Sequence, residues 1–169
     1  MTVHVERLEH SHRLHDFSSG VKALDNWLKV HALENQRRDL SRTFVLVEDN
    51  SRNVLGYYSL TMGQVLPSNL PRAYGRGLPD IQIRMVLLGR LAISTPVQGN
   101  GHGRDLLADA ILQGSMAGEH AAARFIAVDP IDERSRFFYE KFGFKAIGGD
   151  AGGRMYLRVK DVFAALESW

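Results

Sequence analysis

The stretch from Pro96 to Leu107, PVQGNGHGRDLL, places glycines at every second position from 99 to 103, between an apolar run and a segment with helical spacing. Glycine lets the backbone approach a ligand closely and adopt a positive φ at little cost. A helix that begins directly after such a loop presents unpaired N–H groups and the positive end of its dipole. A flexible turn with nothing bound is the other interpretation, but triple alternation at one junction favours a phosphate site.

The segments before this loop predict strands joined by turns. Residues 43–47 and 54–62 are short β-branched and apolar runs with a turn-like segment between them, which indicates a hairpin. Residues 67–80 contain three prolines and two glycines and are expected to form an irregular loop. Residues 81–93, IQIRMVLLGRLAI, form a long apolar run that is typical of a central strand.

Helical spacing marks one segment on each side of the hairpin and loop region. A helix is expected to start near Ser18-Ser19-Gly20 and to run to about Arg38, with Trp27 in the core. A second helix is expected to follow the glycine loop. The apolar positions that carry these two predictions are Leu24, Trp27, Leu28 and Ala32 for the first helix, and Leu106, Leu107, Ala110 and Ile111 for the second.

The remainder of the chain alternates between the two kinds of element. Residues 124–128 predict a strand, 132–142 a helix rich in aromatic residues, and 144–147 and 154–159 two closing strands before a short terminal helix. Strands lead, helices intervene and strands return, so we expect an α/β or α+β fold with a mixed sheet covered by helices. With 169 residues, 1–169 is expected to form one domain.

Composition narrows the classes of protein that need to be considered. The chain has no cysteine, so disulfides and thiol chemistry are excluded, and it has no apolar run long enough for a signal peptide or a membrane span. We therefore expect a cytoplasmic protein without a membrane partner. The histidines of HSHRLH (His10, His12 and His15) come without a cysteine or carboxylate pattern, so we expect a surface segment and no metal site.

Charge is distributed unevenly although the net charge is only +2. Residues 51–104 hold six arginines and a single acid, Asp80, and they lead into the glycine loop. Arginine favours bidentate phosphate contacts, so this excess fits an anionic partner, while a solvated face without a partner remains open. The arginines that we expect to contact nucleic-acid phosphates are Arg37, Arg38, Arg42, Arg72, Arg76, Arg84 and Arg90.

Two common phosphate-binding loops do not fit. The Walker loop needs a second glycine five positions after the first and then Lys-Ser/Thr, but counted from Gly99 the position of the second glycine holds Arg104, and Asp105 follows it. The dinucleotide-binding pattern needs a third glycine three positions after the second, and Arg104 or Leu106 occupies that position. Nucleotide hydrolysis and nicotinamide chemistry are therefore disfavoured.

Residues 98–103, QGNGHG, instead resemble the Gln/Arg-x-x-Gly-x-Gly/Ala signature of the GNAT acyltransferase superfamily. In that family the loop wraps the pyrophosphate of acetyl-coenzyme A. Residues 88–93, LGRLAI, resemble the family's fourth strand, which holds the pantetheine arm through main-chain groups. Residues 137–144, FFYEKFGF, resemble its closing helix and the strand that follows. The resemblance implies a mostly antiparallel GNAT sheet with the cofactor at a splayed central strand.

The resemblance also implies roles for individual residues. Tyr139 matches a tyrosine that lies next to the sulfur, and its hydroxyl is protonated at neutral pH, so it is the candidate general acid. A tyrosine packed in the core with Phe137 and Phe138 is the alternative. Asp132 stands where many members place an asparagine near the pantetheine. The residues expected to bind acetyl-coenzyme A are Leu91, Ala92, Ile93, Gln98, Gly99, Asn100, Gly101, His102, Gly103, Arg104, Asp132 and Phe138.

Further stretches narrow the resemblance within that superfamily. FSSGVKALDNWL, SRTFVLVE, GYYSLTMG and LPRAYGRGLP are similar to the TacT/AtaT-type GNAT toxins of bacterial type II toxin–antitoxin systems. This resemblance implies transfer of an acetyl group from acetyl-coenzyme A to the α-amine of aminoacyl-tRNA, which blocks translation. It also implies a ribbon-helix-helix antitoxin, through which the complex would bind operator DNA, and it leaves a homodimer open.

The chemistry of the acceptor agrees with an aminoacyl substrate. No general base is evident, and an α-amine titrates near 7.7–8.0 whereas a lysine titrates near 10.4, so only the former is appreciably neutral at pH 7. Two other hypotheses remain at this point. One is a GNAT acetyltransferase acting on a small amine or a protein N-terminus, and the other is an acyl-coenzyme A sensor without turnover.

Overall fold

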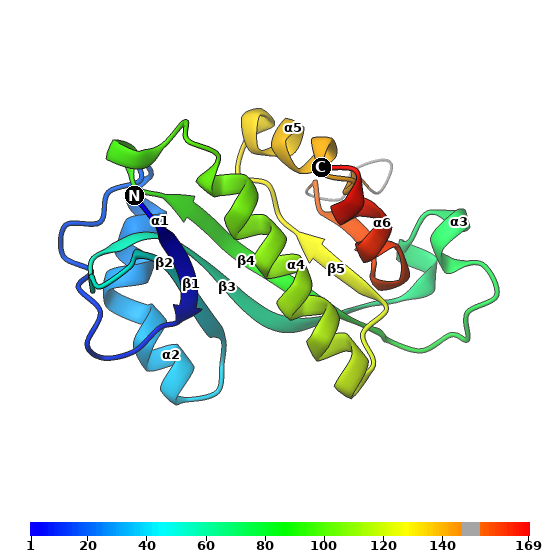
Figure 1. Ribbon diagram of the computed structural model, residues 1–169. Coiled ribbons are helices and arrows are strands. Elements are labelled where there is room, and N and C mark those ends of the chain that lie inside the picture. Colours follow the sequence, from blue (N-terminus) through cyan, green and yellow to red (C-terminus); the bar gives the residue numbers. More distant parts are fainter. Residues whose placement is uncertain (147–152) are drawn as a thin grey trace. The chain divides into compact units, whose positions relative to one another are not determined.

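The computed structural model describes residues 1–146 and 153–169 (Figure 1). In this part of the chain, seven strands follow one another in the hydrogen-bonded order β1-β2-β3-β4-β5-β7-β6. Their bounds are β1 Val3–Arg7, β2 Arg42–Glu48, β3 Val54–Val65, β4 Ile83–Ile93, β5 Phe125–Val128, β6 Lys145–Ala146 and β7 Met155–Arg158. The helices are α1 Lys22–Trp27, α2 Leu33–Arg37, α3 Arg72–Gly75, α4 His102–Ala121, α5 Glu133–Lys141 and α6 Val162–Glu167.

The sheet is mostly antiparallel, as predicted. Strands β1 and β2, β2 and β3, β5 and β7, and β6 and β7 pair antiparallel, and β4 and β5 pair parallel. The predicted hairpin is therefore confirmed in β2 and β3. The described residues divide into two compact units, of which the first contains residues 1–61 and 89–110 and the second contains 62–88 and the residues from 111 onwards.

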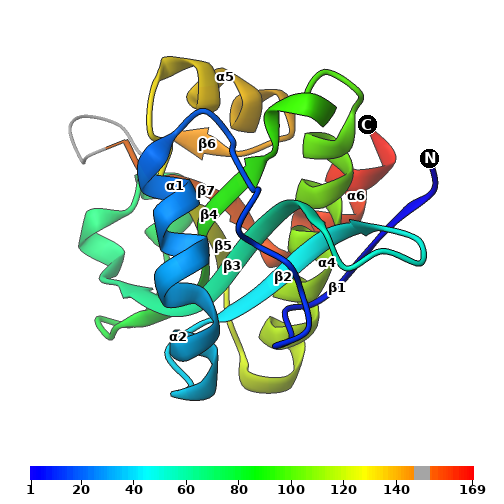
Figure 2. The ribbon, with the colours of Figure 1, turned by 90° about the vertical axis from the view of Figure 1, so that its left-hand side faces the viewer.

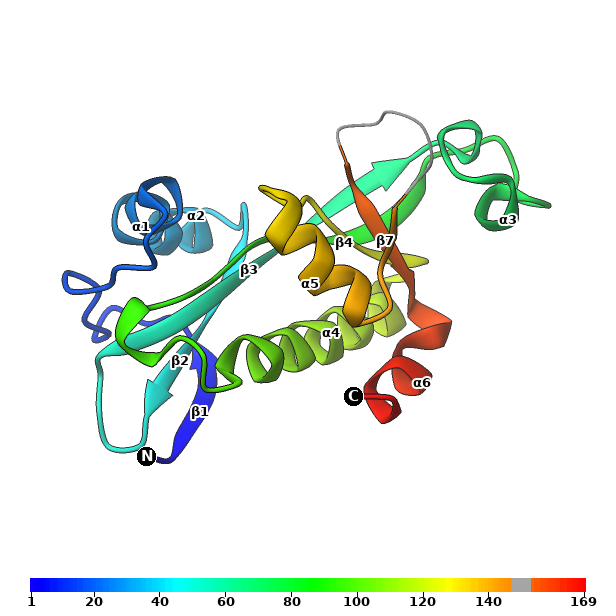
Figure 3. The same ribbon diagram turned by 90° about the horizontal axis from the view of Figure 1, so that it is seen from above.

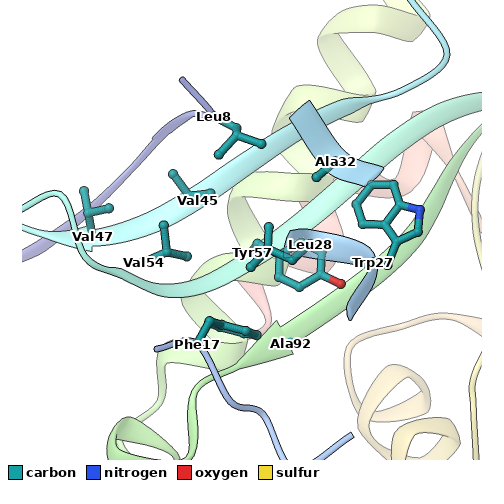
Figure 4. Packing of buried hydrophobic residues seen from close by; sticks show 10 residues of the cluster. All are labelled: Leu8, Phe17, Trp27, Leu28, Ala32, Val45, Val47, Val54, Tyr57 and Ala92. Carbon is teal, nitrogen blue, oxygen red and sulfur yellow. The ribbon is translucent and has the colours of Figure 1, made fainter. Parts of the chain in front are cut away.

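The first unit is built on β1, β2 and the first part of β3. Its core contains Trp27 and Leu28 of the helical segment beside Tyr57 of β3, together with Val45 of β2 (Figure 4). Trp27 is only 8% exposed, which confirms its predicted place in the core. Burying side chains of this size removes apolar surface from water, and each contributes about 1.5–3 kcal/mol to stability.

The helical segment of the first unit runs from α1 into α2 through a π-helical stretch, Leu28–Ala32 (Figures 2 and 3). Leu28 and Ala32 of this stretch are fully buried. The sequence predicted one continuous helix to about Arg38, and the structure agrees except for this wider turn. Such π-helical turns are rare and are found frequently at functional sites.

Successive tyrosines of β3 face opposite sides of the sheet, as the period of a strand requires. Tyr57 stacks on Trp27 with ring centroids 6.0 Å apart, and its hydroxyl donates to the carbonyl of Leu24 at 2.7 Å. Tyr58 stacks on Phe44 and donates to the carboxylate of Asp109 in α4 at 2.5 Å. Each hydroxyl is therefore satisfied although both side chains are fully buried.

The second unit has its own core around β4, β5 and β7. Phe125 of β5 packs edge-on against Tyr156 of β7, with ring centroids 5.5 Å apart. Tyr74 of α3 also lies against the ring of Phe125. The short runs of apolar and aromatic residues on these strands explain why 124–128 and 154–159 could be predicted as strands. Phe142, after α5, contacts Trp169 at the end of the chain at 4.4 Å between centroids.

Two details differ from the sequence prediction. Residues 67–80 were expected to be irregular, but they contain a 3₁₀ turn at Pro67–Asn69 and the short helix α3. His12 was expected on the surface and is buried, because its ring nitrogens bond to the carboxylate of Glu6 at 2.6 Å and to the N–H of Glu9 at 2.8 Å. Of the predicted strand 144–147, residue 147 lies outside the described residues. Within the described ranges, no helix is both long and apolar enough to cross a membrane.

Candidate functional site

The glycine loop connects the end of β4 to α4 in the first unit. Gly99 and Gly101 adopt φ values of +81° and +83°, and a Cβ built on either would meet no atom within 4 Å. Glycine is therefore required by the backbone conformation and not by crowding, and the space in front of both residues is open. Gly103, the third glycine of the pattern, lies instead within the first turn of α4.

The first turn of α4 presents its N–H groups at this loop. The N–H of Asp105 donates to the carbonyl of Gly101 at 3.2 Å, so the amides of residues 102–104 precede the helical ladder. Nδ1 of His102 is buried and has no hydrogen-bond partner in the described part of the chain. Open space and unpaired amides together fit the pyrophosphate of a coenzyme A thioester.

Gln98 has a structural part in this loop. Its side-chain amide donates to the carbonyl of Ser19 at 2.9 Å and to the carbonyl of Ile93 at 2.8 Å. Both amide hydrogens are thus used within the protein, and Gln98 holds the loop in shape instead of offering its donors to a ligand. Asn100 is similarly engaged, because its amide donates to the carbonyl of Val97 at 3.2 Å.

The segment before α1 is fastened to the same loop by further hydrogen bonds. The N–H of Thr95 donates to the carbonyl of Ser18 at 2.8 Å, and the hydroxyl of Ser94 donates to the same oxygen at 3.3 Å. Asp25 accepts from the N–H and the hydroxyl of Ser19 at 2.9 and 2.6 Å. The contacts of Ser18 and Ser19 with this loop could not be predicted from the sequence, because their partners Ser94 and Gln98 lie 76 and 79 residues away in the chain.

Tyr139 lies in α5, in the second unit, and is buried. Its ring packs edge-on against Phe138 and Phe144, with centroids 5.3 and 5.7 Å apart. Burial raises the pKa of Tyr139 well above its ordinary value of about 10, so its hydroxyl is protonated at neutral pH. No hydrogen bond joins this hydroxyl to another of the described residues.

Asp132 forms the N-cap of α5. Its carboxylate accepts from the N–H of Ser135 at 2.8 Å, while the Ser135 hydroxyl lies 3.1 Å from the N–H of Asp132, which completes a capping box. The bond from the backbone of Ser135 lowers the pKa of Asp132 below its ordinary value. One of its oxygens is therefore committed to the helix, and Phe138 packs inward against Tyr139 and Phe142.

The arginines expected to bind nucleic acid differ in their surroundings. Arg37 pairs with Glu34 at 2.9 Å and Arg42 with Asp39 at 2.7 Å, whereas Arg38 is exposed. In the second unit Arg84 contacts the side chain of Gln64. Arg72 and Arg76, at the two ends of α3, are exposed. Arg90 lies over the ring of Trp27, with its guanidinium carbon 4.1 Å from the ring centroid.

Comparisons with known proteins agree with the geometry of the loop. The model of the acetyltransferase (GNAT) family matches residues 8–144. The tRNA-acetylating toxin of Mycobacterium tuberculosis (strain ATCC 25618 / H37Rv) is 37% identical over 129 residues, which cover 76% of each chain. The structure of AtaT complexed with acetyl-methionyl-tRNAfMet is 27% identical with a TM-score of 0.89, and the match covers 98% of this chain and 99% of that one.

A second solved structure carries two further ligands. It is a variant of the AtaT toxin bound to the C-terminus of the antitoxin AtaR and to acetyl-coenzyme A, with 25% identity, a TM-score of 0.82, and coverage of 97% of this chain and 98% of that one. The family match spans most of the chain and includes the glycine loop and Tyr139. The chain belongs to the GNAT family of acetyl-coenzyme A-dependent N-acetyltransferases.

Proposed function

We propose that this acetyltransferase transfers an acetyl group to the α-amine of aminoacyl-tRNA and thereby blocks translation. The observation that carries the proposal is the 37% identity to a tRNA-acetylating toxin over 76% of the chain. The full-length likeness to AtaT in complex with acetyl-methionyl-tRNAfMet supports it. An acetylated α-amine cannot act as a nucleophile in peptide-bond formation, so the charged tRNA is lost to elongation.

In this proposal the loop 98–104 binds the pyrophosphate of acetyl-coenzyme A. The open space at Gly99 and Gly101 admits the phosphates to the backbone, and the amides of the first turn of α4 donate to them. Arg104 is exposed at this turn and adds a positive charge. Gln98 and Asn100 contribute by fixing the course of the loop.

The main chain of Leu91, Ala92 and Ile93 holds the pantetheine arm and, through an N–H group, stabilises the negative charge that develops on the thioester oxygen. These residues end β4, directly before the turn at Thr95–Val97. Asp132 is assigned to the pantetheine through the oxygen that its cap leaves free, and Phe138 lines the same region of α5.

Tyr139 acts as the general acid. Acyl transfer breaks the bond between the carbonyl carbon and sulfur, and the sulfur leaves as a thiolate that needs a proton. The hydroxyl of Tyr139 is protonated at neutral pH because burial raises its pKa, and it has no competing partner among the described residues. It therefore donates its proton to the departing sulfur.

The acceptor amine needs little help to become nucleophilic. An α-amine has a pKa near 7.7–8.0, and the adjacent ester lowers it further, so a sizeable fraction is neutral at pH 7. Water then takes the proton that the amine loses on acylation.

The phosphates of the tRNA are bound by arginines. Arg38, Arg72 and Arg76 are exposed, and none forms an ion pair within the residues that the structure describes. Arg37 and Arg42 are each paired with a neighbouring carboxylate and must exchange that partner for a phosphate. Arg84 and Arg90 complete the set, and the whole interaction is expected to weaken steeply with salt.

A cognate antitoxin is the expected protein partner, as AtaR is for AtaT. We assign it to the ribbon-helix-helix class, with a tail that covers the arginine-bearing surface and a DNA-binding part that takes the complex to operator DNA. The proposed site of action is the cytoplasm, and a homodimer is compatible with this assignment. Co-expression with the neighbouring open reading frame should restore growth and yield a co-purified complex, and failure of both would contradict the pairing.

The test of the proposed function is direct. The protein is incubated with acetyl-coenzyme A and a pool of charged tRNA, and the tRNA is then digested with RNase. The masses of the 3′-terminal aminoacyl nucleosides are measured by mass spectrometry. We expect a gain of one acetyl group on one or a few aminoacyl-adenosines. Acetylation of free polyamines or of protein N-termini with the aminoacyl-adenosines unchanged would instead support a small amine or a protein as acceptor.

A further inference from the structure

Among the described residues, Arg90 of the first unit contacts an aromatic ring and no carboxylate. It lies in β4, and its guanidinium carbon is 4.1 Å from the centroid of the Trp27 ring. Arg37, Arg42 and Arg52 all contact carboxylates at 2.7–2.9 Å. Within the part of the chain that the structure describes, Arg90 forms no ion pair.

The carboxylate closest to Trp27 in the sequence of α1 already accepts hydrogen bonds from another residue. Asp25 is the acid of α1, two residues before Trp27, and its Oδ1 accepts two hydrogen bonds from Ser19. The partly buried guanidinium therefore faces an aromatic ring instead of a carboxylate, and its five N–H donors remain available to an anion.

Trp27 is held rigidly beneath Arg90. Its other contacts lie in the core, where it stacks on Tyr57 at 6.0 Å with an angle of 12° between the rings. The hydroxyl of Tyr57 is in turn bonded to the carbonyl of Leu24. A guanidinium stacked on a fixed ring loses less freedom on binding an anion than a solvated arginine does.

A second arginine provides a contrast. Arg158 also lies over an aromatic ring, with its guanidinium carbon 5.4 Å from the centroid of Tyr74, but it donates to the carboxylate of Asp161 at 2.7 Å. Stacking with an acid partner serves the fold. Arg90 is stacked on a ring but has no acid partner among the described residues, so its positive charge can pair with a bound anion.

We propose that Trp27 positions Arg90 to bind the phosphodiester nearest to the reacting amine of aminoacyl-tRNA. The inference rests on the proposed function. Arg90 directly precedes Leu91–Ile93, the main chain assigned to the acetyl donor, so its backbone lies within about 3–10 Å of those residues along the strand. The amino acid that carries the acceptor amine is esterified through its carboxyl group to the terminal ribose, and the phosphate 5′ of that nucleoside is the closest anion of the substrate.

Two small acceptor substrates distinguish a contact with the terminal phosphodiesters from contacts with the rest of the tRNA. The first is aminoacyl-adenosine, which carries no phosphate, and the second is an aminoacylated CCA trinucleotide, which carries the terminal phosphodiesters. Both bear the amino acid that the wild-type protein acetylates on tRNA. KM and kcat are measured for each acceptor, and the Kd for acetyl-coenzyme A is measured by calorimetry.

We expect Arg90→Ala to raise the KM for the CCA acceptor about ten- to hundredfold, which is the loss of a charged hydrogen-bonded contact. The KM for aminoacyl-adenosine and the Kd for acetyl-coenzyme A should stay within twofold. The dependence of log KM on log salt should also fall by about 0.7, the value for one single-strand phosphate contact.

The positioning role of Trp27 is tested by substitutions that change the ring beneath Arg90. Trp27→Phe keeps a ring face and should leave the KM for the CCA acceptor within about threefold of wild type, whereas Trp27→Leu should raise it as Arg90→Ala does. The double variant Trp27→Leu/Arg90→Ala should be no worse than Arg90→Ala alone, because the ring acts through the guanidinium. Arg158→Ala, the matched arginine with an acid partner, should leave this KM unchanged.

Three results would overturn the inference. They are an unchanged KM for the CCA acceptor in Arg90→Ala, an equal loss with both acceptors, or a weaker Kd for acetyl-coenzyme A, which would assign the guanidinium to the donor. If Trp27→Leu does not fold, Arg90→Ala and Trp27→Phe still decide the question. Failure of the wild-type protein to acetylate charged tRNA would count against the proposed function, and it is measured separately.

Discussion

Tyr57, Tyr58 and Tyr139, three of the buried tyrosines, differ in what their hydroxyls contact. Tyr57 and Tyr58 of β3 stack on neighbouring rings and direct their hydroxyls to Leu24 and Asp109. Tyr139 of α5 is packed among phenylalanines, and its hydroxyl has no partner among the described residues. A buried hydroxyl is normally satisfied within the protein. In the function proposed above, the first two hydroxyls serve the fold and the third acts on the substrate.

The largest effect is expected from Tyr139→Phe. The ring keeps its packing and only the hydroxyl is lost, so the rate of acetyl transfer should fall about a hundred- to ten-thousandfold. The Kd for acetyl-coenzyme A and the melting temperature should change little, since the hydroxyl acts on charge that develops as the thioester breaks. Single-turnover transfer measures the effect. A rate within about threefold of wild type would place Tyr139 with the structural tyrosines.

The cofactor loop gives the next largest effect. Gly101→Asp forces a side chain into a left-handed backbone conformation and adds a negative charge facing the pyrophosphate, so affinity for acetyl-coenzyme A should fall about tenfold or more. Gly77→Asp is the matched control, because Gly77 has φ +77° and equally open space but lies outside the loop. Calorimetry on both should show the loss of affinity in Gly101→Asp alone, and an equal loss in both would remove the loop from the binding site.

Tyr58→Phe should show the opposite pattern from Tyr139→Phe. It breaks the 2.5 Å bond to Asp109 and leaves that carboxylate short of a donor, at a cost of about 1–3 kcal/mol in the free energy of unfolding. The transfer rate should stay within about twofold, as the hydroxyl takes no part in the chemistry. Denaturant unfolding and the single-turnover assay measure the two quantities. A large loss of rate without loss of stability would refute the division of the tyrosines into two kinds.

The smallest effect is expected in the pH profile. Burial raises the pKa of Tyr139, so the protonated acid persists to higher pH than a free tyrosine and is lost only above pH 10. The rate should rise as the α-amine of the substrate deprotonates and then stay level to about pH 9. Single-turnover rates at short times, corrected for spontaneous ester hydrolysis, give this profile. A falling limb below pH 9 would show that an acid with a lower pKa protonates the sulfur.

The sequence predicted the parts of the fold that follow from local patterns. The apolar run 81–93 became β4, the two shorter apolar runs before it became the β2–β3 hairpin, and the glycines at 99 and 101 adopt the positive φ that their spacing indicated. Each of these properties is encoded within about ten residues. The predicted boundaries were therefore within three residues of the observed ones.

Contacts between distant segments could not be predicted in this way. Gln98 was expected to bind the cofactor, yet its donors bond to Ser19 and Ile93, and Ser19 lies 79 residues away. Trp27 was correctly placed in the core, but its contact with Arg90 depends on β4 lying beside α1. The sequence also does not show which partner an arginine contacts. Arg37 and Arg42 pair with carboxylates, whereas Arg90 lies over an aromatic ring.

The substrate is the central claim, and the ratio of two specificity constants tests it most directly. Acetyl transfer from labelled acetyl-coenzyme A is measured to an aminoacyl-tRNA and to the methyl ester of the same amino acid, which has a similar amine but no nucleic acid. Binding of the tRNA by the arginines is expected to raise kcat/KM at least about a hundredfold over the methyl ester. Equal values for the two acceptors would contradict the account and identify a small-amine acetyltransferase.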